Sequence, residues 1–326
     1  METYFSDIKK VLKKILPKKI YGIGKFFYRN IKKYKYEMEV KKRSKYSIFE
    51  VSKLTKDMEL FTDEYGYNAF YGYDKAVKKL LHWPQNIPIY GGIEHGFGYN
   101  NDLSGMDVKK DVIYVGSNWR RELYLNKFPK KIIICIGPVI QYFENMYDEQ
   151  TMRIWKEDLG RTLLVMPPHS SHYDKAQYEQ RTIIEEINRI KKEKNFDTVL
   201  VCVYWVDYLD GRMDLFKAED YILCTAGHIY DYNFLPRLKA ILTLCDMVFL
   251  STIGTNVGFI MALNKPIYLF LEKWKKVNII TNEIQENEDM GFFCELEKEA
   301  EKLFGKYSEE ITEEQIKFVR KYWGEW

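Results

Sequence analysis

The sequence lacks a hydrophobic run long enough to cross a bilayer, since none of its apolar stretches reaches the roughly 18 residues that a membrane-spanning helix needs. It also lacks a secretory signal pattern, because lysines interrupt every apolar stretch near the start and no small-residue cleavage site follows. We therefore expect a cytosolic protein. The 326 residues suffice for two domains, and 46% apolar with 30% charged residues is the composition of a folded globular chain.

Metal-ligand and common nucleotide signatures are missing as well. The five cysteines show no CxxC spacing, and no persuasive DxD motif occurs, so we expect neither a metal ion nor a bound cofactor. Four cysteines lie in or beside apolar runs and are predicted to be small buried residues: Cys135, Cys202, Cys224 and Cys245. The phosphate-loop pattern GxxxxGK[ST] and the dinucleotide pattern GxGxxG are absent, which excludes two frequent kinds of nucleotide site.

Residues 1–45 concentrate the positive charge of the chain. They carry 13 Lys and 2 Arg against 4 acidic residues, a net charge of +11, which leaves −8 for the remainder because the whole chain carries +3. Apolar residues recur at helical spacing between the lysine pairs, at Ile8, Val11, Leu12, Ile15 and Leu16. Pro17 ends or kinks this helix, and a weaker stripe follows at Ile20, Ile23, Phe27, Ile31 and Tyr34.

Two interpretations of this basic segment are open. It is either a helix lying in the plane of an anionic membrane surface, where each Lys or Arg adds about 1 kcal/mol, or a terminal helix packed on the body with its lysines in water. We favour the first, and predict that residues 1–34 hold the protein at the inner face of the cell membrane. No recognised nucleic-acid-binding motif is present, so we expect no nucleic-acid partner.

From about residue 46, short apolar runs alternate with helical segments, which predicts an α/β fold with mostly parallel, doubly wound sheets. The predicted strands are Ile87–Tyr90, Val112–Val115, Ile132–Ile136, Thr162–Met166, Thr198–Tyr204, Tyr221–Thr225, Met247–Leu250 and Ile267–Phe270. Helices are predicted at about 141–159, 175–193, 233–244 and 255–263. We expect two Rossmann-like lobes, residues 46–155 and 156–326. A last helix should begin at Thr312, where TEEQ fits a capping box, and pack back on the body.

Ligands of open α/β sheets bind beyond the carboxyl ends of the strands, so the loops at these ends are the candidate sites. The strongest signal is the loop after Met247–Leu250, which is rich in small and hydroxylated residues and leads into a helix: Ser251, Thr252, Gly254, Thr255 and Asn256. We expect Gly254 to allow a tight turn and Thr255 or Asn256 to cap the helix, whose N–H groups and dipole would hold a phosphate. The alternative is an ordinary capped turn.

Two further loops offer polar groups at strand ends. In LLVMPPHSSHYD, two prolines fix the loop, and His169, Ser170 and Ser171 are candidate contacts for a phosphate or a sugar hydroxyl; the alternative is a rigid turn with a serine cap. In AGHIYDYNFLPRLKAIL, His228 and Arg237 flank a helix start and are candidate nucleotide contacts, although an arginine in this setting is more often a surface residue.

The order of these elements resembles the donor lobe of GT-B-fold glycosyltransferases, and most of all bacterial enzymes of capsule and lipopolysaccharide assembly. The likeness covers roughly residues 160–272 and is carried by PPHSS, AGH…FLPRLKAIL and CDMVFLSTIGTNVGFIMALNKPIYL. The ExxxxxxxE motif of many retaining enzymes is absent, because Val257 to Leu263 contain no acidic residue. The resemblance implies a nucleotide-sugar donor in the C-terminal lobe, a glycan or lipid-linked acceptor in the N-terminal lobe, inversion at the sugar carbon and no divalent metal.

An inverting transfer needs a base that takes the proton of the acceptor hydroxyl. The glycine-rich loop GGIEHGFGYNND offers Glu94, His95 and Asp102 within nine residues, and its glycines would let an acceptor approach the backbone. Each of the three could instead be a buried structural residue. Other functions also stay open: a nucleotide-sugar 2-epimerase or a glycerol-phosphate transferase on the same fold, or a non-enzymatic binding protein of envelope assembly.

Overall fold

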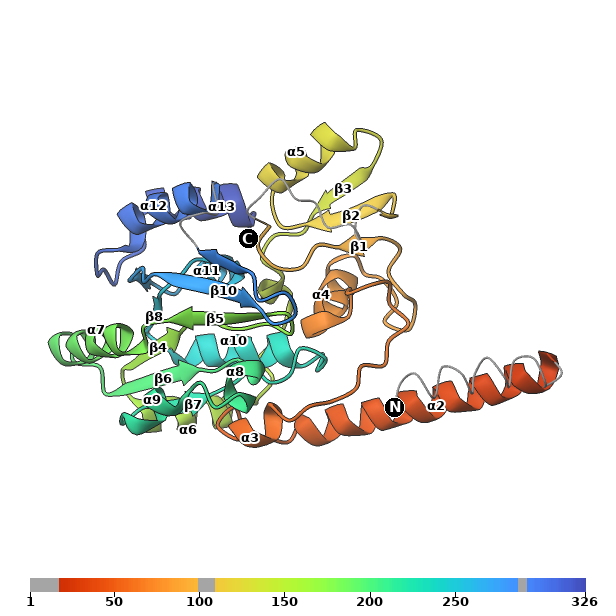
Figure 1. Cartoon of the computed structure of the whole chain (residues 1–326), viewed down its shortest axis with the longest axis horizontal. Helices are drawn as coiled ribbons and strands as arrows, with labels where there is room; N and C mark the ends of the chain where they lie inside the picture. Colours follow the sequence, from red (N-terminus) through yellow and green to blue (C-terminus); the bar gives the residue numbers. More distant parts are fainter. Residues whose placement is uncertain (1–17, 99–108, 287–291) are drawn as a thin grey trace.

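The computed structural model describes residues 18–98, 109–286 and 292–326 of the chain. Helix α2 (Lys18–Arg43) runs out from a body built around two parallel sheets (Figure 1). The short helix α3 (Val51–Leu54) and the 3₁₀ turn η1 (Phe70–Gly72) follow it along the chain. The apolar stripe predicted at Ile8, Val11, Leu12, Ile15 and Leu16 lies outside the described residues. None of the described helices combines the length and apolarity that a membrane span requires.

The larger sheet has five parallel strands in the order β7-β6-β4-β8-β9. Their bounds are β4 (Thr162–Met166), β6 (Thr198–Cys202), β7 (Ile222–Cys224), β8 (Met247–Leu250) and β9 (Ile267–Leu269). The chain moves outward from β4 through β6 to β7 and then returns to β8, which pairs with the other edge of β4. The strand order therefore reverses between β4 and β8, the point at which doubly wound sheets bind their ligands.

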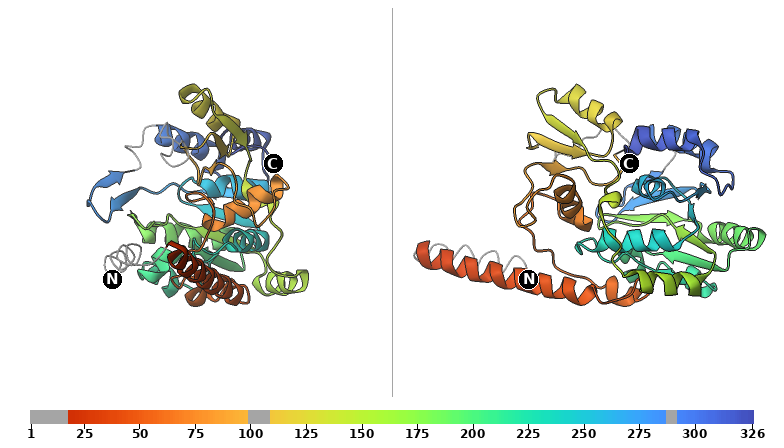
Figure 2. Two further views of the ribbon diagram at one scale, coloured as in Figure 1. Left: turned by 90° about the vertical axis from the view of Figure 1, so that its right-hand side faces the viewer. Right: turned by 180° about the vertical axis from the view of Figure 1, so that it is seen from behind.

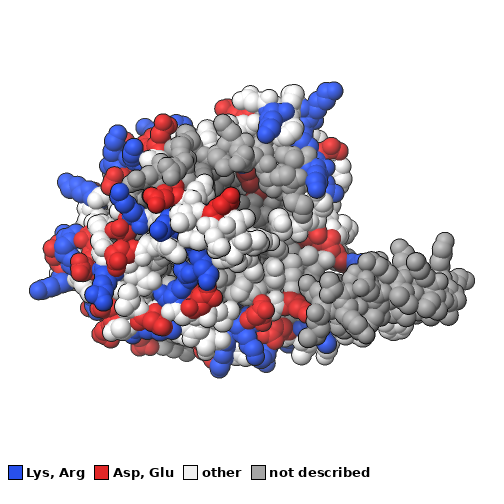
Figure 3. All heavy atoms as spheres, viewed as in Figure 1, with Lys and Arg blue, Asp and Glu red and all other residues white. Residues whose placement is uncertain are grey.

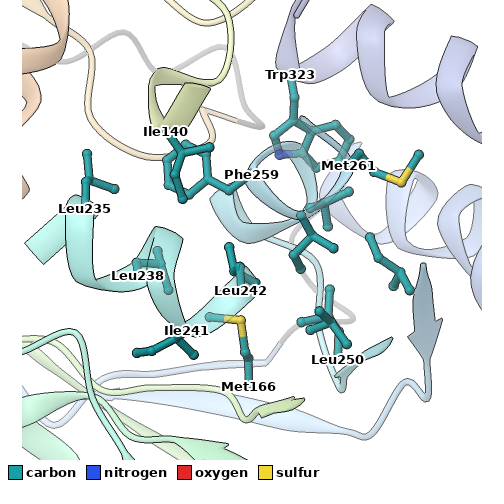
Figure 4. Close-up of a cluster of buried hydrophobic side chains, with 14 of the residues drawn as sticks. Ile140, Met166, Leu235, Leu238, Ile241, Leu242, Leu250, Phe259, Met261 and Trp323 are labelled. Carbon is teal, nitrogen blue, oxygen red and sulfur yellow. The ribbon is translucent and has the colours of Figure 1, made fainter. Parts of the chain in front are cut away.

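Helices cover both faces of this sheet because successive strand residues point to opposite faces and both sets are apolar. One core contains α7 (Gln180–Glu193) and α9 (Asp214–Ala218). The other contains α10 (Phe234–Leu244), α11 (Thr255–Ala262) and α12 (Phe292–Phe304). In Figure 4, Ile241 and Leu242 of α10 lie next to Met166 at the end of β4, and Phe259 of α11 lies beside Ile140.

The smaller sheet has three parallel strands in the order β1-β2-β3: β1 (Gly92–Ile93), β2 (Val112–Val115) and β3 (Ile132–Cys135). Helix α5 (Asn118–Lys127), capped by the Ser117 hydroxyl, packs on one face, and α4 (Tyr73–Leu80) packs on the other. The turn η3 (Val139–Tyr142) and helix α6 (Glu149–Leu159) lead to the larger sheet. Helix α13 (Glu313–Trp323) contacts α5, which covers the smaller sheet, and α11, which covers the larger sheet.

The α/β class with parallel sheets is confirmed, and so is the capping box, in which Thr312 and Gln315 bond each other reciprocally. Three element predictions are wrong, and one of them is the helix at 141–159, which is a helix only from Glu149. Residues Ile87–Tyr90 are irregular, and the first strand is Gly92–Ile93. The predicted helix at 175–193 is a helix only from Gln180.

The first residues of that predicted helix form β5 (Asp174–Tyr178), which joins β10 (Trp274–Asn278) and β11 (Ile284–Glu286) in an antiparallel sheet. Pairing with β10, about a hundred residues further along the chain, overrides the local helical pattern of Asp174–Tyr178.

The short helix α8 (Trp205–Leu209) follows β6 of the larger sheet. Of the four cysteines expected to be buried, Cys224 and Cys245 are buried and Cys202 is half-buried. Cys135 is exposed, because it is the last residue of β3, on the outer edge of the smaller sheet.

Candidate functional site

Two adjoining cavities lie where the strand order of the larger sheet reverses. The first, which we call the aromatic cavity, measures about 230 Å³ and is lined by residues that follow β4, β6 and β7 and by α10 and α11. The second, the loop cavity, measures about 210 Å³ and lies between the loops that follow β4 and β8. The two share five lining residues: Met166, Pro167, His169, Thr255 and Asn256. Each alone is smaller than the roughly 300 Å³ at which small-molecule sites begin, and together they exceed it.

The N-terminus of helix α11 opens on the loop cavity. Gly254 is its N-cap and makes no side-chain cap, and the backbone at Gly254 is extended, with a φ of −172°. The expectations of a tight turn at Gly254 and of a cap from Thr255 or Asn256 are therefore wrong. A Cβ added to Gly254 would meet nothing within 4 Å, so the residue leaves open space at the cavity wall. The first N–H groups of α11 and the positive end of its dipole face that space.

Lys276 on β10 brings a positive charge to the same cavity. Its ammonium lies 5.3 Å from the centre of the Trp274 ring, and both side chains line the loop cavity. Burial lowers the pKa of Lys276 below its usual value, and the nearby Asp174 raises it by a smaller amount. Within the described part of the chain, Lys276 has no ion-pair partner. A partly desolvated ammonium beside a helix N-terminus is an arrangement that favours an anion.

The predicted donor loops contribute only some of their residues to these cavities. His169 lines both cavities, and Thr252 lines the loop cavity while donating a hydrogen bond of 3.1 Å to Glu297. The two serines hold the turn into β5, since the Ser170 hydroxyl accepts from the Ala176 N–H and the Ser171 hydroxyl from the Asp174 N–H. Their side chains are therefore engaged in the turn, as the structural alternative proposed, but neither serine caps the following helix, because the N-cap of α7 is Glu179.

Ser251, His228 and Arg237 are buried and do not line the cavities described here. Arg237 pairs with the equally buried Asp231, with 2.8 Å between guanidinium and carboxylate, and it also bonds the Ala226 carbonyl. The structure thus places Arg237 neither on the surface nor among the cavity residues.

His228 is held by its neighbours in the loop that follows β7. Its ring packs against Trp205 with ring centres 4.0 Å apart and accepts a hydrogen bond from the Tyr230 N–H. The Nε2 atom lies 3.3 Å from a carboxylate oxygen of Asp57. The ring therefore packs against α8 and does not line either of the two cavities.

The aromatic cavity owes its walls to residues that the sequence did not single out. Tyr71, Tyr73 and Tyr204 line it together with Phe234 and Phe259. The Tyr71 and Tyr204 hydroxyls lie 2.9 Å apart and share a hydrogen bond. Tyr71 also adopts a φ of 58°, a left-handed conformation that is rare for a bulky residue. Strain of this kind at a cavity wall is typical of ligand sites.

A third cavity lies at the carboxyl ends of the smaller sheet, and we call it the small-sheet cavity. It measures about 40 Å³, room for two or three water molecules. Glu94 lines it and is held in a buried ion pair, 2.6 Å from Arg120, with the Tyr124 hydroxyl 3.1 Å away. Burial raises the pKa of the Glu94 carboxyl, and the bonds from Arg120 and Tyr124 oppose that shift.

The other two predicted bases are placed differently. His95 packs between Phe70 and Tyr73, with ring centres 6.1 and 4.8 Å away, and is absent from the walls of the three cavities. Its Nε2 is buried without a hydrogen-bond partner among the described residues, and burial lowers the pKa of the ring to about 4. Asp102 lies outside the described residues.

Trp323 of α13 contacts both the loop that follows β8 and the glycine-rich loop that follows β1. Its indole N–H donates to the Gly254 carbonyl over 2.8 Å, and its ring stacks on Phe97 of the glycine-rich loop with centres 4.1 Å apart. A Cβ on Gly258 would come within 2.7 Å of the indole, so only glycine permits this approach. Gly96 of the same loop lies over Thr255, whose hydroxyl would be 3.5 Å from an added Cβ. The small-sheet cavity and the aromatic cavity therefore meet at the start of α11.

The two buried histidines predict an acid-sensitive fold. Burial lowers the pKa of both His95 and His228 to about 4, against about 6.5 in an unfolded chain. The folded state then binds fewer protons than the unfolded state, and the free energy of unfolding should fall by about 1.4 kcal/mol per pH unit for each histidine as the pH drops through this window. Urea unfolding at about pH 7 and about pH 5 measures the slope. His228→Phe keeps the packing on Trp205 and should remove about half of it; an unchanged slope would contradict the assignment.

Within the ranges described, no three His, Cys, Asp or Glu side chains lie close enough together to hold a metal ion. Lys276, Trp274 and Tyr71 were missed by sequence reasoning, and Trp323 belongs to a last helix that was expected only to pack on the body. A signal existed for Lys276, which follows Trp274 at the two-residue spacing that puts both on one face of a strand. Comparisons of the chain with protein-family models, with curated proteins and with solved structures find no match.

Proposed function

We propose that this protein is a glycosyltransferase with a two-lobed, GT-B-like arrangement, transferring a sugar from a nucleotide-sugar donor to a glycan or lipid-linked acceptor, as in capsule or lipopolysaccharide assembly. One observation carries the proposal. At the reversal point of the larger sheet, a helix N-terminus and Lys276, which has no ion-pair partner among the described residues, flank a cavity that adjoins a second one with aromatic walls. A phosphate group suits the first cavity and a planar ring suits the second.

The donor's phosphates would lie in the loop cavity. The N–H groups at the start of α11 would donate to phosphate oxygens, and Lys276, which forms no ion pair among the described residues but lies near the carboxylate of Asp174, would add a positive charge. His169 stands at the boundary between the two cavities and would contact the phosphates or the ribose. The nucleobase would then extend into the aromatic cavity, where Tyr71, Tyr204 and Phe234 offer faces for stacking.

The acceptor would approach from the smaller sheet. Glu94 lies at the carboxyl end of β1, and the glycine-rich loop that follows it reaches the start of α11. The small-sheet cavity admits an acceptor hydroxyl but not a whole sugar ring, so the sugar would lie at its mouth. Glu94 would take the hydroxyl proton while the oxygen attacks the anomeric carbon from the face opposite the leaving nucleotide, which inverts that carbon. The N-terminus of α11 and Lys276 would stabilise the departing diphosphate without a divalent metal.

Nucleotide binding tests the donor site directly. A uridine, guanosine, thymidine, adenosine or cytidine diphosphate that saturates the site at 100 times its Kd should raise the free energy of unfolding by about 2.7 kcal/mol. Lys276→Met should weaken binding by roughly 10- to 100-fold, because it removes one charge-assisted contact. Gly254→Val should fold normally, since its side chain meets open space, yet obstruct the cavity.

Lys275→Met is the matched control, because Lys275 is the adjacent lysine on β10 and does not line the loop cavity. Its affinity should equal that of the unmodified protein. Binding unaffected by Lys276→Met and Gly254→Val would mean that the nucleotide lies elsewhere. A product formed from donor alone, with no acceptor added, would favour the epimerase alternative over group transfer.

A further inference from the structure

Helix α2 presents an apolar stripe on the side that faces away from the body. Phe27, Ile31 and Tyr34 recur at helical spacing and are 62%, 54% and 64% exposed, and Met38 continues the stripe one turn further on. The right-hand view in Figure 2 shows α2 extending away from the body. Large apolar side chains in a row of this kind are rare on a surface that meets only water.

The opposite side of α2 is the one that packs. Val40 and Arg43 are fully buried, and the Tyr36 hydroxyl donates to the Tyr230 carbonyl over 2.8 Å. Arg43 donates to the Leu54 carbonyl over 2.9 Å and to the Lys56 carbonyl over 2.7 Å. The C-terminal turns of α2 are therefore fixed to the body, and the projecting stripe keeps a defined direction. The alternative of a terminal helix packed on the body by its apolar stripe does not hold for residues 26–38.

Basic residues border the stripe. Lys35, Lys41 and Lys42 are exposed and lie three or four residues from stripe positions, hence next to it on the helix surface. On the face of the body seen in Figure 3, acidic and basic side chains are interspersed, so the body offers no comparable single-sign region there. The concentration of charge is in residues 1–45, with a net +11.

We propose that the α2 stripe is a docking surface for an anionic phospholipid bilayer, with the helix lying in the plane of the interface. Its aromatic and aliphatic side chains enter the boundary between headgroups and acyl chains, and the bordering lysines pair with lipid phosphates. A second copy of this chain fits less well, because stripe-to-stripe contact would bring two segments of net charge +11 together. The inference is independent of the proposed chemistry, since vesicle binding needs neither donor nor acceptor.

Vesicle flotation tests it with the full chain. The protein should float with vesicles of phosphatidylcholine mixed with phosphatidylglycerol, remain unbound with phosphatidylcholine alone, and detach as salt screens the charges. The triple variant Phe27→Ser, Ile31→Ser, Tyr34→Ser should bind at least about tenfold more weakly, because it removes most of the apolar contact.

The matched control replaces three residues of similar exposure away from α2: Ile132→Ser, Tyr173→Ser and Ile280→Ser. It should float like the unmodified protein. Light scattering should give the same mass for all three proteins. A dimer that the stripe variant converts to monomer would overturn the proposal in favour of self-association. Equal flotation of the stripe variant and the control would overturn it as well.

Discussion

Replacing Glu94 with Gln should lower turnover by about 10²- to 10⁴-fold, the range that a general base contributes. The glutamine keeps the size of the side chain and an oxygen that accepts from Arg120, but it cannot take a proton. Donor affinity should change little, because Glu94 lines the small-sheet cavity and neither of the cavities assigned to the nucleotide. Product formation at saturating donor, per folded molecule, is the measurement.

A purely structural role for Glu94 must be distinguished from a catalytic one, since its partner Arg120 is also buried. Turnover and thermal unfolding should therefore be measured on the same samples. If Glu94→Gln unfolds at lower temperature but its folded fraction turns over normally, Glu94 is only the partner of Arg120. His95→Ala is the comparison variant, and we expect a smaller loss because the His95 ring packs behind Tyr73. Normal turnover in both variants would move the search to Asp102.

The dependence of turnover on pH is a second test of Glu94 as the base. Burial raises the pKa of Glu94 above its ordinary value, and a base acts only when it is deprotonated. Activity should therefore fall as the pH drops, with an acid limb above the pKa of an ordinary glutamate, near about 4.3. The limb should be lost in Glu94→Gln together with the activity. A profile that is flat down to the point of acid unfolding would argue against this carboxyl.

The larger sheet could be predicted from the sequence because its strands are buried on both faces. Thr162–Met166 and Met247–Leu250 are continuous apolar runs, and such runs are visible without any knowledge of the partner strand. The pairing of β4 with β8 brings their two loops together at one place, as the sequence predicted. All five histidines also fall in irregular segments.

The antiparallel sheet could not be predicted in the same way. Its strands are short and polar, and its pairing joins Trp274 to Tyr178, a contact that local periodicity does not encode. Lys276, which we regard as the most informative residue of the loop cavity, belongs to that sheet. The sequence also does not predict which way individual side chains point. The serines of the PPHSS loop lie next to the cavity residue His169 but turn toward the backbone of β5.

Arg237 illustrates how a polar residue at a strand end can serve the fold rather than a ligand. Replacing it with Met should lower the free energy of unfolding by about 3–5 kcal/mol, because it leaves the carboxylate of Asp231 buried without its counter-ion. The affinity for nucleotide should be unchanged in the protein that remains folded, since Arg237 lines neither donor cavity. Lys276→Met should behave in the opposite way, with stability retained and affinity lost.

The double variant Asp231→Asn, Arg237→Met is the control for the stability that Arg237→Met loses. The introduced asparagine is neutral, and its side-chain oxygen could still accept from the Asn233 N–H, as the carboxylate of Asp231 does over 2.9 Å. Removing both charges together abolishes the cost of an unpaired one, so the double variant should recover most of the lost stability. Chemical unfolding of the three proteins measures this, with nucleotide titration in parallel. Weaker nucleotide binding by Arg237→Met at undiminished stability would instead return Arg237 to the donor site, where the sequence alone had placed it.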